Sequence, residues 1–151
     1  MPDAEPIVPN FHGNFEYGID ASKRVMVPAK WRPEDPNVLF TLILWPINVE
    51  QYVLVLPPNR WHAMLEKLKA QSLDDEVVAA IERVIGETSV QLTLDRAGRF
   101  CLPEFLTRPA GITDKVKFVP RLDKFEMWDP ERRAAALASD KTLAASKKIG
   151  L

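Results

Sequence analysis

An aspartate and an arginine four residues apart occur twice in this chain, as Asp20 with Arg24 and as Asp95 with Arg99. A guanidinium group can donate two parallel hydrogen bonds to O6 and N7 of guanine or to a phosphate. A carboxylate in a tight turn can accept hydrogen bonds from the backbone of the residues that follow it. Two interpretations are open. In the first, each aspartate–arginine pair only holds its turn closed by hydrogen bonds and an ion pair, which we call a staple. In the second, each turn also presents a fixed guanidinium to DNA.

The residues around both pairs predict β-strands. Apolar residues at 15, 17 and 19 alternate with other residues before Asp20, and those at 90, 92 and 94 do the same before Asp95. A period of two indicates half-buried strands and argues against a helix. We expect one β-hairpin with strands near 13–19 and 24–27, and a second over 89–102. A two-stranded ribbon of this kind fits the major groove of DNA.

The charge distribution supports a surface for nucleic acid, although the net charge is only −1. The predicted DNA-contacting residues are Asp20, Lys23, Arg24, Asp95, Arg96 and Arg99, with Lys30, Arg32 and Arg108 nearby. Acidic residues lie on or beside the segment between the two pairs, namely Glu66, Asp74, Asp75, Glu76, Glu82 and Glu87. This polarity suits a protein whose helices face away from DNA. The alternative is an interaction module or scaffold that docks a basic protein partner on an acidic helical face.

The chain divides into two similar halves with extensions at both ends. We expect a flexible arm over 1–12, a first half over 13–87, a second half over 88–138 and a tail over 139–151. Further strands are predicted at 38–45, 52–56, 116–119 and 125–128, with short helical turns at 28–32 and 103–107. A helical hairpin over 58–86, ended by Gly86, lies between the halves, and Asp129 caps a C-terminal helix. The predicted fold is a β-rich α+β structure in which both halves share one barrel-like core.

Several classes of protein are excluded by what the sequence lacks. No apolar run approaches the roughly 20 residues of a membrane-spanning helix, and the N-terminus has no secretion-signal pattern. Cys101, the single cysteine, excludes an internal disulfide and is predicted to be a buried strand thiol between Phe100 and Leu102. The two histidines lack metal-ligand spacing, and no phosphate loop or catalytic triad stands out. We expect a cytoplasmic protein that is not an enzyme and takes no cofactor, metal, membrane or small-molecule substrate.

The duplicated segments Asp20-Ala-Ser-Lys-Arg-Val-Met-Val-Pro28 and Asp95-Arg-Ala-Gly-Arg-Phe-Cys-Leu-Pro103 resemble the MraZ family of bacterial transcription regulators. The stretch Phe125-Glu-Met-Trp-Asp-Pro130 also resembles the second-half ending of that family. The resemblance implies an internally duplicated swapped-hairpin fold related to the AbrB class. It also implies a ring-shaped homo-oligomer on the nucleoid, which binds direct repeats in the promoter of the division and cell-wall gene cluster and represses it. The family motif assigns DNA contact to Asp20, Arg24, Asp95 and Arg99.

One residue departs from the family pattern at the first turn. The family commonly has glycine before the arginine, and Gly98 keeps it, whereas Lys23 replaces it in the first copy. Glycine adopts positive φ at little cost, while lysine does not. We therefore expect the first turn to have a different backbone shape, with Lys23 adding a phosphate contact.

Overall fold

The protein is a mixed α+β structure, as the sequence predicts. The computed structural model describes residues 9–46, 50–71, 75–138 and 146–150. The strands are β1 (Phe15–Gly18), β2 (Arg24–Met26), β3 (Phe40–Trp45), β4 (Tyr52–Leu56), β5 (Ser89–Leu92), β6 (Arg99–Cys101), β7 (Lys115–Pro120) and β8 (Phe125–Trp128). The helices are the 3-10 turn η1 (Ala29–Trp31) and the α-helices α1 (Pro58–Lys69), α2 (Glu76–Glu87), α3 (Glu104–Ala110) and α4 (Pro130–Ala138). The segment after Pro103 thus forms a helix longer than the predicted turn.

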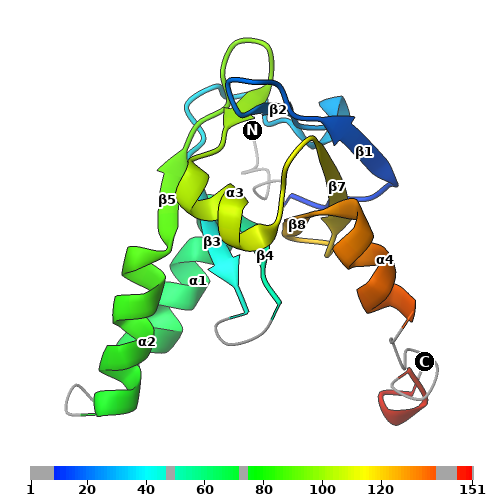
Figure 1. The fold of residues 1–151 in the computed structure, drawn as a ribbon. Coiled ribbons are helices and arrows are strands. Elements are labelled where there is room, and N and C mark those ends of the chain that lie inside the picture. The colour runs from blue at the N-terminus through cyan, green and yellow to red at the C-terminus, as the bar shows by residue number, and fades with distance from the viewer. Residues whose placement is uncertain (1–8, 47–49, 72–74, 139–145, 151) are drawn as a thin grey trace, which may run out of the picture.

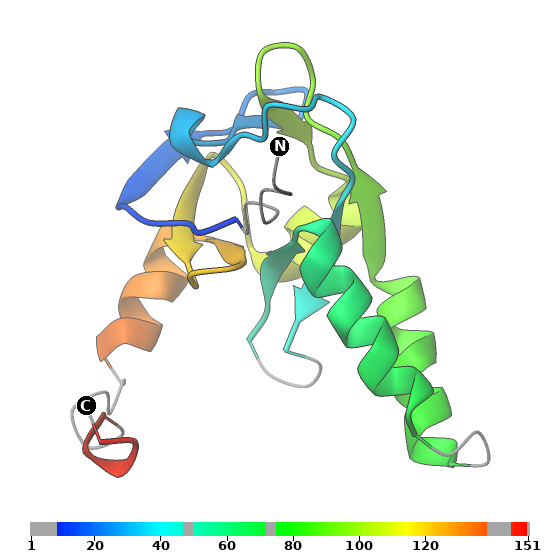
Figure 2. The same cartoon turned by 180° about the vertical axis from the view of Figure 1, so that it is seen from behind.

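The described strands form two antiparallel sheets and no closed barrel, so the predicted barrel is wrong. Six strands pair in the order β1-β7-β8-β4-β3-β5, and β2 pairs with β6 in a separate two-stranded ribbon. The strands on either side of the first turn do not pair with each other beyond a single bridge between Ile19 and Val25. Instead, β1 pairs with β7, and β2 pairs with β6. The ribbon therefore lies across one end of the sheet instead of closing it (Figures 1 and 2).

Strands from the two parts of the chain pair with each other in both sheets. β1 pairs with β7, and β5 pairs with β3, so the strand before each turn joins the part of the chain that holds the other turn. β2 likewise pairs with β6, and β4 with β8. Each of these pairings joins a strand before residue 88 to one after it. The packing of one part therefore depends on the other.

The main core lies between the six-stranded sheet and the β2–β6 ribbon. Alternation directs Val25 and Phe100 inward from the ribbon, and both side chains are 0% exposed. They pack in one cluster with Leu106 of α3, Phe118 of β7 and Phe125 of β8. Burial of these large apolar side chains fixes which face of the short ribbon points outward.

Phe11, at the end of the predicted N-terminal arm, is part of this core. Its side chain is 4% exposed and packs edge-on against Trp31 and Phe125. Its backbone N–H donates to the carbonyl oxygen of Leu122. The packed structure therefore includes residues before 13, whereas residues 1–8 of the predicted arm lie outside the described residues.

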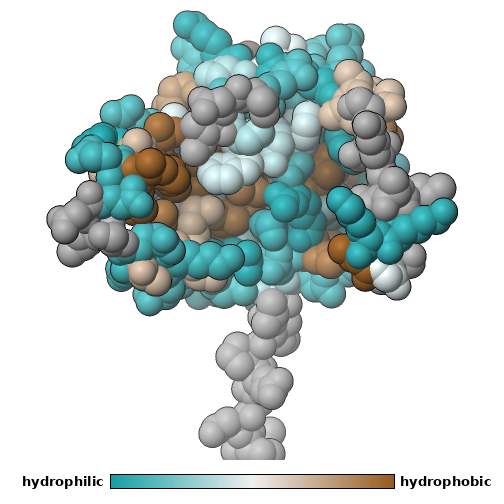
Figure 3. Space-filling view, turned by 90° about the horizontal axis from the view of Figure 1, so that it is seen from below, coloured by the Kyte–Doolittle hydropathy of each residue, from teal (hydrophilic) through white to brown (hydrophobic). Residues whose placement is uncertain are grey.

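A smaller apolar cluster lies on the other face of β3 and β4, beneath the helical hairpin α1–α2. Ile43 and Leu54 are buried there with Ile85 of α2. An apolar stripe on α1, which includes Trp61 and Met64, packs against them and stays partly exposed. Figure 3, viewed from the end opposite the ribbon, shows apolar residues reaching the surface on the side of this hairpin.

Local hydrogen bonds define the ends of α2 and the start of α4. Asp75 caps α2, because its carboxylate accepts from the backbone N–H groups of Val77 and Val78. Gly86 does not end α2, which continues to Glu87. Asp129 caps α4 as predicted, with Oδ2 accepting from the Arg132 backbone N–H at 3.1 Å.

Two further sequence predictions concern the C-terminal tail and membrane-spanning helices. Residues 139–145 and 151 of the predicted tail lie outside the described residues. Among the described helices, none is long and apolar enough to cross a membrane.

Candidate nucleic-acid interface

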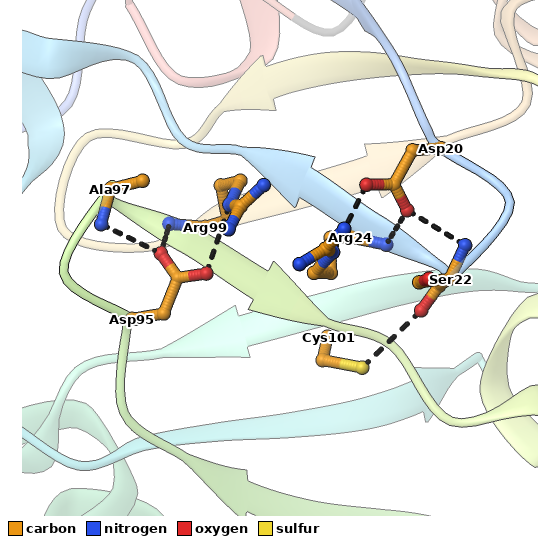
Figure 4. Close-up of polar contacts among 7 residues, drawn as sticks. All are labelled: Asp20, Ser22, Arg24, Asp95, Ala97, Arg99 and Cys101. Atoms are coloured by element: carbon orange, nitrogen blue, oxygen red, sulfur yellow. Dashed lines mark hydrogen bonds and ion pairs between the residues drawn. The ribbon is translucent and has the colours of Figure 1, made fainter.

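The first turn is built around the carboxylate of Asp20 (Figure 4). Its Oδ1 accepts from the backbone N–H groups of Ser22 at 2.9 Å and Arg24 at 3.0 Å. Its Oδ2 accepts from Nε of Arg24 at 3.0 Å. The Lys23 N–H donates to the Asp20 carbonyl oxygen, and the Asp20 N–H donates to that of Arg24, which closes the turn.

The second turn repeats this geometry. Asp95 Oδ1 accepts from the backbone N–H groups of Ala97 and Arg99, both at 2.9 Å. Asp95 Oδ2 accepts from Nε of Arg99 at 2.9 Å, and Gly98 N–H donates to the Asp95 carbonyl oxygen. The staple interpretation is thus correct for both turns. It is also compatible with presentation of each guanidinium to DNA, because the staple uses only Nε of each arginine.

Each staple lowers the pKa of its carboxyl group. The hydrogen bond from the Arg24 backbone N–H is the main cause for Asp20, and it outweighs the opposing effect of partial desolvation. The hydrogen bond from the Arg99 backbone N–H does the same for Asp95, whose pKa is also lowered. Charge attraction from each arginine adds to the effect. Both carboxylates are therefore ionised at neutral pH and orient the guanidinium beside them.

The two turns have the same backbone shape, so the predicted difference at Lys23 is wrong. Lys23 has a φ of 63° and Gly98 a φ of 81°, which places both in the left-handed region. In each turn the left-handed residue donates its backbone N–H to the carbonyl oxygen three residues earlier, an arrangement typical of three-residue hairpin loops. Left-handed backbone costs a side-chain-bearing residue about 1–2 kcal/mol, and the hydrogen bonds around Asp20 hold Lys23 there despite that cost.

The β2–β6 ribbon brings the two arginines onto one outward face. Arg24 lies opposite Cys101, and Arg99 lies opposite Met26, with the buried pair Val25–Phe100 between them. Arg24 and Arg99 are therefore diagonal neighbours, with Cα atoms roughly 7–8 Å apart in such a ladder. Figure 4 shows their side chains next to each other between the two turns. The site is one ribbon, not the two separate hairpin tips that the sequence predicts.

The arginine side chains are oriented by their staples and remain accessible. Arg24 is 41% exposed and Arg99 is 30% exposed. Within the described residues, the terminal Nη groups of both arginines take part in no hydrogen bond that the structure records. Each guanidinium therefore keeps the Nη donors that a guanine edge or a phosphate requires.

One backbone hydrogen bond ties each turn to the residue that follows the ribbon strand of the other half. Val27 N–H donates to the Gly98 carbonyl oxygen at 2.9 Å, and Leu102 N–H donates to that of Lys23 at 2.8 Å. The left-handed residue of each turn is thus an anchor for the opposite strand. The position of one arginine depends on the shape of both turns.

Arg32 supports the second turn, although in sequence it is close to the first. Its Nε donates to the Val27 carbonyl oxygen at 2.9 Å. A Cβ built on Gly98 would lie 2.5 Å from Arg32 Cζ, so the side chain of Arg32 lies directly against this glycine. Gly98 thus adopts its positive φ at little cost and leaves the space that the Arg32 side chain occupies.

The remaining basic residues differ in their surroundings. Arg96 is exposed on the second turn, Lys23 is partly exposed on the first, and Lys30 is exposed on η1. Arg108 is engaged by Glu104, with Nη2 and Oε1 2.5 Å apart. The helical hairpin mixes Arg60, Lys67, Lys69 and Arg83 with its acidic residues, and Asp74 lies outside the described residues. The predicted acidic helical face therefore does not carry a single sign of charge.

Met26 and Cys101 are residues of this surface that sequence reasoning missed. Cys101 is exposed, so its predicted burial is wrong. The reason is the alternation itself: Phe100 and Leu102 point inward, which directs Cys101 outward beside Met26. The phase of the apolar residues contained this signal.

The described residues offer few other candidate sites. They contain no group of three or more histidine, cysteine or acidic side chains that could hold a metal ion. Two open pockets of about 370 Å³ each are found: one is lined by residues of β7 and α4 with Gly13 and Asn14, and the other by residues 121–124 with Pro9 and Asn10. The paired arginines are thus the main chemical feature of this surface.

These features define the protein as an α+β protein with a basic two-stranded β-ribbon. A surface of this kind is suited to binding nucleic acid. Comparison with known proteins shows the family: the chain belongs to the MraZ family. It is 31% identical over 141 residues to the transcriptional regulator MraZ of Pseudomonas putida, covering 93% of this chain and 92% of that protein. It is 27% identical over 142 residues to the transcriptional regulator MraZ of Histophilus somni, covering 93% of each. No family model matches the chain.

These relatives are named as transcriptional regulators and not as enzymes. The names agree with the prediction that this chain is not an enzyme. The resemblance read from the two aspartate–arginine motifs is confirmed over nearly the whole chain.

Proposed function

We propose that the protein is a DNA-binding transcriptional regulator and that the outer face of the β2–β6 ribbon enters the major groove. The observation that carries this proposal is the pair of stapled arginines on one face, each with Nη groups that make no recorded hydrogen bond to the described residues. The major groove of B-DNA is about 12 Å wide and admits a two-stranded ribbon. Arg24 and Arg99 would then read guanines, while Asp20 and Asp95 hold them in position. Lys23 and Arg96 would contact phosphates beside the groove.

Substitution of both arginines tests this proposal. In a gel-shift assay at fixed salt, the doubly substituted Arg24→Ala, Arg99→Ala protein should bind the DNA upstream of its own coding region at least about 30-fold more weakly, since each bidentate contact to guanine contributes roughly 1–3 kcal/mol. The matched control is Lys67→Ala with Arg83→Ala, which removes the same charge from the helical hairpin and should bind normally. Equal binding by the arginine variant and the wild type would refute the proposal.

We further propose that the protein binds promoter repeats as a homo-oligomeric ring. The family resemblance supports this, and so does the partly exposed apolar stripe of α1, which a second copy can cover. Non-specific contacts by one ribbon give dissociation constants of only about 10⁻⁴–10⁻⁶ M, so several linked ribbons would raise occupancy by avidity. Light scattering should give a mass several times the 17.1 kDa of one chain, and a footprint should show evenly spaced protected segments. A monomeric mass with a single protected segment would refute the ring.

The remaining parts of the proposal rest on the same resemblance. The halves 13–87 and 88–138 would be two copies of a swapped-hairpin unit, and the exchanged pairings β1–β7 and β5–β3 support that assignment. The regulator would act on the division and cell-wall gene cluster as a repressor, in the cytoplasm at the nucleoid. Transcript levels of that cluster should rise when the gene is deleted, and a fall would refute repression.

A further inference from the structure

Met26 occupies an unusual place on the outward face of the ribbon. It is an exposed large hydrophobic residue, 40% accessible, and lies directly opposite Arg99. Its neighbours in the chain, Val25 and Val27, are buried, at 0% and 1%, so the alternation leaves Met26 no access to the core. It belongs to neither of the two apolar clusters of the described residues. Packing within this chain therefore gives no reason for an apolar side chain here.

The opposite corner of the ribbon is also occupied by a sulfur-containing side chain. Cys101 lies across from Arg24, and its thiol donates to the Ser22 carbonyl oxygen at 3.5 Å. The thiol is thus turned toward the first turn. Met26 is the unbranched, polarizable side chain on this face that can adapt to a surface placed against it.

We propose that Met26 is a specificity-determining residue that contacts the C5-methyl group of thymine in the DNA bound by the ribbon. This inference rests on the proposed function, because it assumes that the ribbon lies in the major groove. Thymine methyl is the apolar group that the major groove presents, whereas the other base edges there present hydrogen-bond donors and acceptors. An exposed thioether next to a guanidinium therefore pairs an apolar contact with a polar one.

The ribbon geometry places this contact close to a guanine. Directly opposed residues of an antiparallel pair have Cβ atoms roughly 4.5–5.5 Å apart, and Met26 and Arg99 are such a pair. Successive base pairs rise by about 3.4 Å. The thymine that Met26 contacts thus lies about one to two steps from the guanine that Arg99 reads.

The test removes the methyl group from the DNA. The region upstream of the coding sequence is amplified with dUTP in place of dTTP, which replaces thymine by uracil without changing base pairing. Wild-type protein should bind the thymine duplex about fourfold more tightly per contacted methyl than the uracil duplex, from the burial of one methyl group. Met26→Ser should bind both duplexes equally, with the affinity of the wild type for the uracil duplex.

Two comparisons make the outcome decisive. Val77→Ser removes an apolar side chain that is 67% exposed on α2, and it should keep the full preference of the wild type for thymine. A wild type that does not distinguish the duplexes, or a Met26→Ser variant that still does, would overturn the inference. Binding that depends on Arg24 and Arg99 but not on the methyl group would refute this inference alone. Binding that is independent of both arginines would refute the proposed function.

Discussion

Replacing Gly98 with alanine tests the geometry of the second turn. The left-handed backbone at φ 81° costs a residue with a Cβ about 1–2 kcal/mol. The new Cβ also displaces Arg32, whose hydrogen bond to the Val27 carbonyl oxygen, from a charged donor, contributes about 1.5–3 kcal/mol. Reduced freedom of the unfolded chain returns about 0.4–1 kcal/mol. We expect the free energy of unfolding to fall by about 2–4 kcal/mol.

Urea unfolding at equilibrium measures this change. The fluorescence of the four tryptophans, which include Trp31 in the core beneath the ribbon, reports on unfolding. Protein concentration is held fixed, because association of copies would change the apparent stability. The slope of the transition should be unaltered, which would show that the variant changes stability and not the surface exposed on unfolding.

A double-mutant cycle separates the two causes. In an Arg32→Ala background, Gly98→Ala should cost only the backbone part, about 1 kcal/mol, because no side chain then overlaps the new Cβ. Lys23→Ala is the matched control in the first turn, where the left-handed residue already carries a Cβ, and should change stability by less than about 0.5 kcal/mol. An unchanged cost of Gly98→Ala in the Arg32→Ala background would refute the contact between Arg32 and Gly98.

Two further predictions concern the turns. Lys23→Gly should raise the free energy of unfolding by about 0.5 kcal/mol, since relief of left-handed strain slightly exceeds the added freedom of glycine in the unfolded chain; a decrease in the same urea assay would contradict this. Because the pKa values of Asp20 and Asp95 are lowered, their stabilising effect is fully present above the ordinary carboxyl range and is lost as pH falls below it. NMR titration of the two carboxyl carbons should give midpoints below the value of about 3.9 for unstructured aspartate, and midpoints at or above that value would contradict the staple.

Features set by neighbouring residues could be predicted from the sequence. The aspartate staples, the alternation beside them and the cap of α4 depend on residues within four positions of one another. The exposure of Cys101 follows from the same alternation, had its phase been applied from Phe100. The predicted shape of the first turn is wrong because the hydrogen bonds that Asp20 supplies outweigh the intrinsic backbone preference of Lys23.

Features set by distant residues could not be predicted in this way. Alternation shows that a segment is a strand, but it does not show its partner, since pairing depends on packing across the whole core. The prediction of two hairpins is therefore wrong: β1 pairs with β7 and β5 with β3, while β2 and β6 pair with each other. Arg32 shows the same limit: its sequence position suggests a place beside Arg24, whereas the fold puts it against Gly98.

The exchange of strands explains why the candidate interface requires two copies of the aspartate–arginine motif. A single aspartate–arginine staple fixes one guanidinium on one short strand, and a strand of three residues such as β2 has no stability of its own. Pairing of β2 with β6 provides the second strand, the second guanidinium and the buried pair Val25–Phe100 that holds the outward face in register. The reciprocal bonds from Val27 and Leu102 then join each turn to the opposite strand. The candidate interface is therefore a property of the pair, and neither half of the chain contains it alone.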